Sequence, residues 1–255
     1  MKSISLFVER DSFVHRIDPI SKIVYILFAI AVPIILPMIS IALVCSMMSI
    51  ALLVMAKVFW KSLPIYGFVL LVLSTVLIIQ SLFYEGNTTP LFSLGSLVFY
   101  QEGLLYALLI SLRVINIVGA FMILVLTTKP SDLVESLVRK GLSPRFGYVL
   151  QSVFQIIPQM MSTMGTITDA QRSRGMETEG NLWVRMKAFL PLLGPVVLNS
   201  LIQTKERAMA LEVRGFNASG QKTYLHEEKS YAYSHLIQGG LVLLVVLAVV
   251  WRVIS

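Results

Sequence analysis

The sequence predicts an all-α, polytopic membrane protein with about five transmembrane helices plus a cytoplasmic domain of long amphipathic helices. Hydrophobic residues make up 56% of the chain and charged residues only 14%, against roughly 25% charged in an average soluble domain. Apolar runs recur that are long enough to cross a bilayer, which takes about 20 residues. The basic residues between these runs alternate in a pattern typical of one membrane orientation. This composition excludes a disordered chain, a collagen-like fibre and an ordinary soluble enzyme.

Five membrane spans are predicted from the apolar runs. Residues 23–56 carry no charge over 34 positions, which is too long for one span, and Pro33 and Pro37 disrupt the helix near its middle. We therefore expect two helices there, joined by a very tight turn. In the fourth span, the small residues Gly119 and Ala120 would let another helix approach closely. The predicted spans are roughly 22–37, 39–56, 63–83, 104–127 and 233–251.

The basic residues also predict the orientation. The loop 84–103 has no Lys or Arg, whereas residues 128–230 carry 13 of the 21 basic residues. Because basic loops stay in the cytoplasm, we expect a multi-pass protein of the cell membrane with a cytoplasmic N-terminus. The sequence thus divides into spans one to four in 1–127, a cytoplasmic domain in 128–230, and the last span in 231–255.

Three helices are predicted in the cytoplasmic domain. The first is short and ends at Gly141. Ser143 and Pro144 start the second, because Ser caps a helix and Pro is favoured at its first position. This helix is expected to run to Arg174 with a kink near Pro158.

The third helix is expected over 182–214. Two stretches of these long helices, 146–164 and 189–204, are apolar enough to suggest membrane spans. A crossing and return would place several basic residues outside, against the positive-inside rule. We therefore interpret both stretches as amphipathic helices that lie in the interface or pack under the spans.

The two long helices end on the same pattern, Ala-x-x-x-Arg-Gly, with the two copies 40 positions apart. Ala and Arg at i and i+4 share one helix face, so the small Ala leaves room beside the Arg for another surface. Gly after the Arg can adopt the left-handed conformation that ends a helix, which leaves the Arg projecting at the terminus. The candidate residues are Ala170, Arg172, Arg174, Gly175, Ala210, Arg214 and Gly215.

Arg-Gly at a helix end also has a purely structural interpretation. The cation suits the negative end of the helix dipole, and Gly suits the cap. A single copy favours that interpretation. Two copies, both ending long cytoplasmic helices, favour a binding role, since an Arg fork pairs bidentately with a carboxylate.

With these residues in place, the chain resembles a known family, EcfT or CbiQ, the transmembrane (T) components of energy-coupling factor (ECF) transporters. The resemblance covers most of the chain, and the two Ala-x-x-x-Arg-Gly endings are its most specific part. Further support comes from His15–Lys22 before the first span, Thr127–Pro130 after the fourth, and Asp132, Leu133 and Leu137 beyond it. Ile20 departs from the Arg that the family usually has there.

The resemblance implies a non-catalytic coupling subunit. Two cytoplasmic ABC ATPases would bind ATP, and this chain would bind no cofactor of its own. By motif match, Arg174 would dock on one ATPase and Arg214 on the other. The apolar faces of 145–165 and 186–204 would hold one small membrane protein, the S component, which binds the substrate and topples in the membrane. The cargo would be a vitamin, a vitamin precursor or a metal ion, and we favour a thiamine precursor.

Single residues elsewhere carry weaker signals. Arg113 lies inside the fourth span, where an ionisable residue is a functional candidate or a structural pair. Asp18 and Lys22, at i and i+4, predict a helix pair and a structural cap. His15, His226 and His235 are scattered, and Cys45 is the single cysteine, so no metal site is predicted.

Two other functions remain as alternatives. A permease of another ABC class would form the translocation path itself, although such a domain usually offers one coupling loop rather than two Arg-ended helices. An intramembrane enzyme would need polar groups converging at membrane depth, and no nucleophile–base motif is recognisable. The sequence has no Gly-x-x-x-x-Gly-Lys-Ser/Thr loop for a nucleotide. The lipid bilayer is an expected partner and nucleic acid is not.

Overall fold

The computed structural model describes residues 7–94, 97–175, 181–218 and 234–254. It divides the chain into two compact units. The first comprises Met1–Leu137 and Lys229–Ser255, and the second comprises Val138–Glu228. Each unit is described by itself below.

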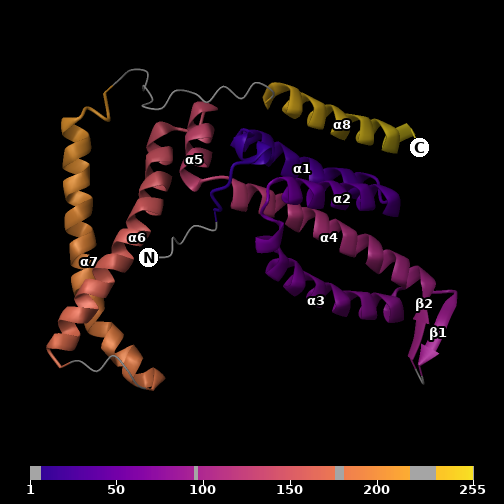
Figure 1. Ribbon diagram of the computed structural model, residues 1–255, viewed down its shortest axis with the longest axis horizontal. Coiled ribbons are helices and arrows are strands. Elements are labelled where there is room, and N and C mark those ends of the chain that lie inside the picture. The colour runs from indigo at the N-terminus through magenta and orange to yellow at the C-terminus, as the bar shows by residue number, and fades with distance from the viewer. Residues whose placement is uncertain (1–6, 95–96, 176–180, 219–233, 255) are drawn as a thin grey trace. The chain divides into compact units, whose positions relative to one another are not determined.

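Five helices of the first unit form a helical bundle (Figure 1). Its helices are α1 (Pro19–Ile35), α2 (Ile39–Met55), α3 (Phe59–Phe83), α4 (Gln101–Thr127) and α8 (Ser234–Ile254). A short 3-10 turn, Phe13–Arg16, precedes α1. Within the described ranges, α3, α4 and α8 are long and apolar enough to cross a membrane, while α1 and α2 are apolar but have 17 residues each. Seventeen residues is the lower limit for a span.

α4 is the central helix of the bundle. It packs against α1, α2 and α3, and α8 packs against α1 (Figure 1). The close packing predicted at Gly119 is confirmed, because an added Cβ would lie 2.6 Å from the Tyr66 hydroxyl and 3.0 Å from Ser49 Cβ. A larger residue at this position would therefore require the Tyr66 hydroxyl to move and Ser49 to give way slightly.

The expected division of the long apolar run into two helices with a tight turn is confirmed, although Pro33 itself lies inside α1. The helix continues to Ile35, and the turn to α2 lies at Leu36–Met38. Proline removes the N–H that would bond to the carbonyl four residues earlier, which here is that of Ala29. The Asn116 side chain of α4 donates to this carbonyl at 2.7 Å. A neighbouring helix therefore satisfies the group that Pro33 leaves open, as membrane helices require.

A β-hairpin that was not predicted lies between α3 and α4. β1 (Pro90–Leu94) pairs antiparallel with β2 (Leu97–Tyr100). Glu102, in the first turn of α4, accepts hydrogen bonds from the hydroxyls of Thr88 and Thr89, both at 2.6 Å. These bonds fix the hairpin to the end of the bundle that lies away from α5 (Figure 1).

The helices after the fourth span match the prediction closely. α5 covers Pro130–Arg139, α6 covers Pro144–Ser173 and α7 covers Leu182–Val213. Ser143 caps α6 as expected, with its hydroxyl accepting from the Phe146 N–H at 3.2 Å. α6 is a single helix that runs through Pro158.

Candidate functional site

The first Ala-x-x-x-Arg-Gly copy ends α6. The helix stops at Ser173, and Arg174 is its C-cap residue. Gly175 has φ +87° and donates to the Arg172 carbonyl at 2.9 Å. This left-handed conformation is favourable only for Gly, because a side chain there is strained. The predicted helix-ending role of Gly175 is therefore confirmed.

The second copy ends α7 in the same way. Gly215 has φ +69° and donates to the Glu212 carbonyl at 2.9 Å, while Phe216 N donates to the Leu211 carbonyl at 3.0 Å. This pair of bonds is a Schellman motif. The Phe216 ring packs on Tyr148 of α6 with ring centroids 5.3 Å apart. The α7 end is thereby attached to the first part of α6.

At both ends the Ala and the Arg are exposed. Ala170 and Arg174 lie on one face of α6, and Ala210 and Arg214 are placed equivalently at the end of α7. Arg172 is exposed as well, two positions before the cap residue Arg174. Each terminus thus presents a guanidinium beside a small side chain, at a helix end that carries partial negative charge. That arrangement suits a carboxylate on another surface.

α6 and α7 meet along a limited crossing. Arg207 of α7 donates to the Gln159 side chain of α6 at 2.8 Å, and Leu192 and Val196 are the buried apolar residues of α7 among those whose side chains are described. Most other apolar side chains on these helices are exposed. On α6 they are Phe146, Val149, Val153, Phe154, Ile157, Met160 and Met161. On α7, among the residues whose side chains are described, they are Trp183, Leu193, Val197, Leu198, Leu201, Ile202, Met209 and Val213.

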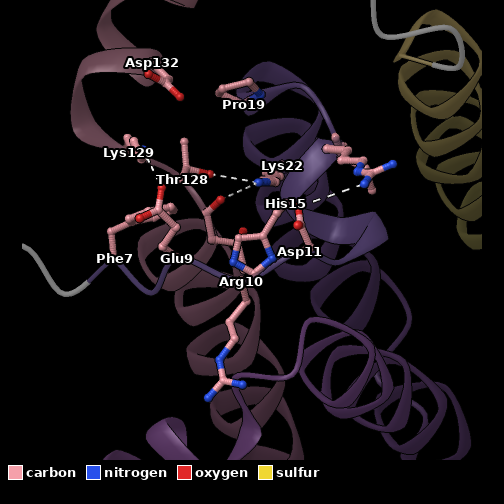
Figure 2. A pocket seen from close by; sticks show the side chains of 13 residues that line it. Phe7, Glu9, Arg10, Asp11, His15, Pro19, Lys22, Thr128, Lys129 and Asp132 are labelled. Carbon is pink, nitrogen blue, oxygen red and sulfur yellow. Dashed lines mark hydrogen bonds and ion pairs between the residues drawn. The ribbon is translucent and has the colours of Figure 1, made fainter.

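A polar cavity of 430 Å³ lies where α1 begins and α4 ends. It unites the two segments that the sequence separately indicated, His15–Lys22 and Thr127–Pro130. Figure 2 shows Lys22 directed toward the end of α4, where it donates to the Thr127 carbonyl at 3.1 Å and to the Thr128 hydroxyl at 3.0 Å. On the opposite wall, Lys129 pairs with Glu9 at 3.1 Å. Lys22 is only 4% exposed, so it caps α4 from within the bundle.

The predicted Asp18–Lys22 pair does not form. Asp18 instead caps α1, accepting from the Ile20 N–H at 3.3 Å, and its second oxygen accepts from Gln238 of α8 at 3.2 Å. Gln238 also donates to the Ser21 hydroxyl at 3.0 Å. The prediction of a cap was correct. The prediction of the pair was wrong because the Lys22 ammonium group donates instead to the Thr127 carbonyl at the end of α4. That carbonyl lies more than 100 positions away in the sequence.

His15 closes the same end of the bundle. One ring nitrogen lies 2.9 Å from the Val8 carbonyl and the other 2.7 Å from the Ser12 hydroxyl. Val8 N in turn donates to the Leu126 carbonyl of α4 at 3.0 Å. Burial lowers the pKa of His15 below its ordinary 6.5, although the hydrogen bond to the Val8 carbonyl raises it. In the described part of the chain, no group of three or more His, Cys, Asp or Glu side chains is placed to hold a metal ion.

A buried polar cluster in the bundle was missed from the sequence. Tyr25 of α1 and Ser49 of α2 lie 2.7 Å apart through their hydroxyls, and Ser49 donates to the Asn116 side chain. Asn116 and Ser49 are both 0% exposed. The available signal was the presence of Ser and Asn within otherwise apolar spans, since such residues join helices in membranes.

Arg113 lies near the middle of α4, one turn before Asn116, and is half-buried. Its Nε is buried, and among the described residues it has no hydrogen-bond partner. The structural pairing that the sequence left open is therefore not observed within the described part of the chain.

The comparisons with known proteins agree with this architecture. The sequence model of the family described as "CbiQ: Cobalt transport protein" matches residues 10–225. The "Energy-coupling factor transporter transmembrane protein EcfT" of Leuconostoc gelidum is 32% identical, covering 86% of this chain and 85% of the relative. The proteins of the same name from Lacticaseibacillus paracasei and Lactococcus lactis are 30% and 29% identical, covering 96% and 98% of this chain and 97% of each relative. The chain, with its bundle of apolar helices and its two Arg-Gly helix ends, therefore belongs to the CbiQ family, alongside the EcfT membrane subunits of energy-coupling factor transporters.

Proposed function

We propose that this chain is the coupling subunit of an ECF importer, transmitting ATP hydrolysis by two cytoplasmic ATPases to a substrate-binding membrane protein. The observation that carries the proposal is the pair of matching helix ends at Gly175 and Gly215, each with an exposed Arg directly before a left-handed Gly. Two equivalent ends suit two equivalent partner subunits.

The contacts proposed for Arg174 and Arg214 follow from their position. Each guanidinium extends from a helix terminus whose backbone is already ordered. Docking therefore costs the conformational entropy of the Arg side chain but little further entropy of the backbone. A carboxylate in a groove of each ATPase would accept a bidentate pair, and Ala170 or Ala210 would allow close approach. Movement of the two ATPases would then displace α6 and α7 directly.

The exposed apolar residues of α6 and α7 are proposed to hold the substrate-binding membrane protein. Apolar surface of this extent on helices outside the long apolar spans favours a protein or membrane partner over water. We further propose that the N-terminus and the α5–α7 segment are cytoplasmic, on the distribution of basic residues, and that the cargo is a vitamin, a vitamin precursor such as that of thiamine, or a metal ion. An ABC permease that forms its own translocation path is the second candidate, favoured only by the polar cluster within the bundle.

The test is co-purification of the tagged chain with its genomic neighbours, in wild type and in the Arg174→Ala/Arg214→Ala variant. We expect wild type to retain two ABC ATPases and one small membrane protein. In the variant, the amount of co-purified ATPase should fall at least tenfold, since Arg is a frequent hot-spot residue at interfaces. The matched control is Arg145→Ala/Lys205→Ala, which removes two exposed cations of the same helices away from their C-terminal ends.

The result also distinguishes the candidates. Retention of the ATPases by the Arg174/Arg214 variant, with normal transport, would show that the two ends are helix caps and nothing more. An equal loss of ATPase in the control variant would show that the loss reflects the lower net positive charge and not the two helix ends. If wild type retains no ATPase, the permease or another function must be considered.

A further inference from the structure

Arg113 is a basic side chain in the interior of α4 for which the described helices of the bundle provide no counter-charge. α1, α2, α3 and α8 contain no Asp or Glu, and the one acid of α4, Glu102, is engaged by Thr88 and Thr89 at the start of that helix. Intramembrane cations are expected to face a partner charge, backbone carbonyls or water. No described helix of the bundle offers the first of these, a free partner charge.

The polar groups nearest to Arg113 along α4 are already engaged. Asn116 bonds to Ser49 and to the Ala29 carbonyl, and Ser111 donates to the Ala107 carbonyl of its own helix. Hydroxyls on other spans do the same, as Ser46 does to Leu43. The described bundle satisfies its interior polar groups, with the Arg113 Nε and the Tyr66 hydroxyl as the buried exceptions.

The depth of Arg113 argues against a lipid headgroup as the missing partner. Arg113 lies twelve residues after Gln101 and fourteen before Thr127, which is about 18 Å and 21 Å from the two helix ends at 1.5 Å per residue. In a hydrocarbon core of about 30 Å, its Cα lies more than 10 Å from either boundary. An extended Arg side chain reaches about 7 Å, so snorkelling stops short of the headgroups.

The face that carries Arg113 borders the outside of the bundle. Ile110 and Ile117, at i−3 and i+4, lie on that face and are, like Arg113, half-buried. The Nε is shielded by the bundle, while the rest of the side chain retains accessible surface. A partner helix can therefore approach Arg113 without entering the bundle.

We propose that Arg113 is the binding site for a carboxylate, Asp or Glu, presented at mid-membrane depth by a transmembrane helix of the membrane partner. This inference rests on the proposed function, because the partner is the substrate-binding membrane protein of the complex. The pair would fix the depth and rotation of the partner helix against α4. A helix without an Asp or Glu at this depth would bury the charge of Arg113 in hydrocarbon without a partner, which is unfavourable. The contact therefore also selects against helices that lack the acid.

The test uses the whole complex in membranes, with a photo-crosslinking residue at Ile110 or Ile117. The control probe is at Leu108, which is 40% exposed and lies on a different face of α4. We expect adducts with the small membrane protein from Ile110 and Ile117 and few from Leu108. Arg113→Gln should reduce these adducts about tenfold, and Arg113→Lys, which keeps the charge, should retain them.

A charge exchange completes the experiment. Mass spectrometry of the adduct identifies an Asp or Glu of the partner, and replacing it by Arg should restore the adducts of Arg113→Glu. Adducts with lipid alone, or adducts unchanged in Arg113→Gln, overturn the inference. In those cases retained ATPases show that the variant is folded and that the proposed function stands. A wild-type chain that retains neither ATPases nor a membrane partner overturns both.

Discussion

The bundle and the α6–α7 pair are held together by different means. In the bundle, buried hydroxyl and amide groups bond from helix to helix, and Ser49 and Asn116 are both 0% exposed. In the pair, the side-chain hydrogen bond from Arg207 to Gln159 is exposed, and apolar residues such as Leu198 and Leu201 are 63% and 62% exposed. The bundle thus carries its own packing partners, whereas the pair has surface left for others. Helices of similar length can therefore owe their packing either to contacts within the chain or to contacts with partners.

The largest effect is expected from Asn116→Leu. This change removes the bond to Ser49 and leaves the Ala29 carbonyl, which Pro33 already deprives of a helix partner, without a donor. We expect the free energy of unfolding to fall by about 2 kcal/mol, since a buried unsatisfied group adds to the lost bonds. Thermal unfolding in detergent measures it.

Thr75→Val is the matched control for that measurement, because Thr75 lies in α3 and bonds only to the Val72 carbonyl of its own helix. We expect a change near zero. Equal losses in the two variants would show that the interhelical bonds of Asn116 add nothing specific to the bundle.

A smaller effect is expected from Gln159→Ala in the α6–α7 pair. The lost bond to Arg207 is exposed to solvent, so its removal should cost about 0.5 kcal/mol or less. Hydrogen exchange of α6 and α7 amides, in the free chain and in the complex, measures it. If the pair depends on partners, complex formation should slow exchange far more than this substitution speeds it. A loss as large as that of Asn116→Leu would contradict the contrast between the two regions.

The smallest effect is expected from acidification at the edge of the bundle. Because the pKa of His15 is lowered in the folded chain, protonation favours the unfolded state. The stabilisation is complete well above pH 6.5 and is lost as pH falls below that value. The thermal midpoint should therefore be lower at about pH 5.5 than at about pH 7.5. In His15→Gln, the difference between the midpoints at these two pH values should be smaller. An unchanged drop in that variant would assign the pH dependence to other groups.

Local patterns predicted most of the elements. Apolar run lengths located the spans, Ser143 and Pro144 located the start of α6, and Gly175 and Gly215 located two helix ends, because each depends on residues within a few positions. The contacts across the chain could not be predicted in this way. Lys22 bonds to Thr127 and not to Asp18 because the bundle brings the end of α4 to it. The hairpin of β1 and β2 was missed because the loop was judged by its charges rather than by its apolar residues.

The contacts at the first turn of α1 have a mechanical consequence. Lys22 holds the end of α4, where the chain leaves the bundle, and Asp18 and Ser21 hold Gln238 of α8, where it returns. The whole excursion between Thr128 and Ser234 is thus tethered at both ends to one helical turn. α1 therefore joins the helix at whose end the chain leaves the bundle to the helix by which it returns. Loss of these few hydrogen bonds at one turn would release the end of α4 and the start of α8 together.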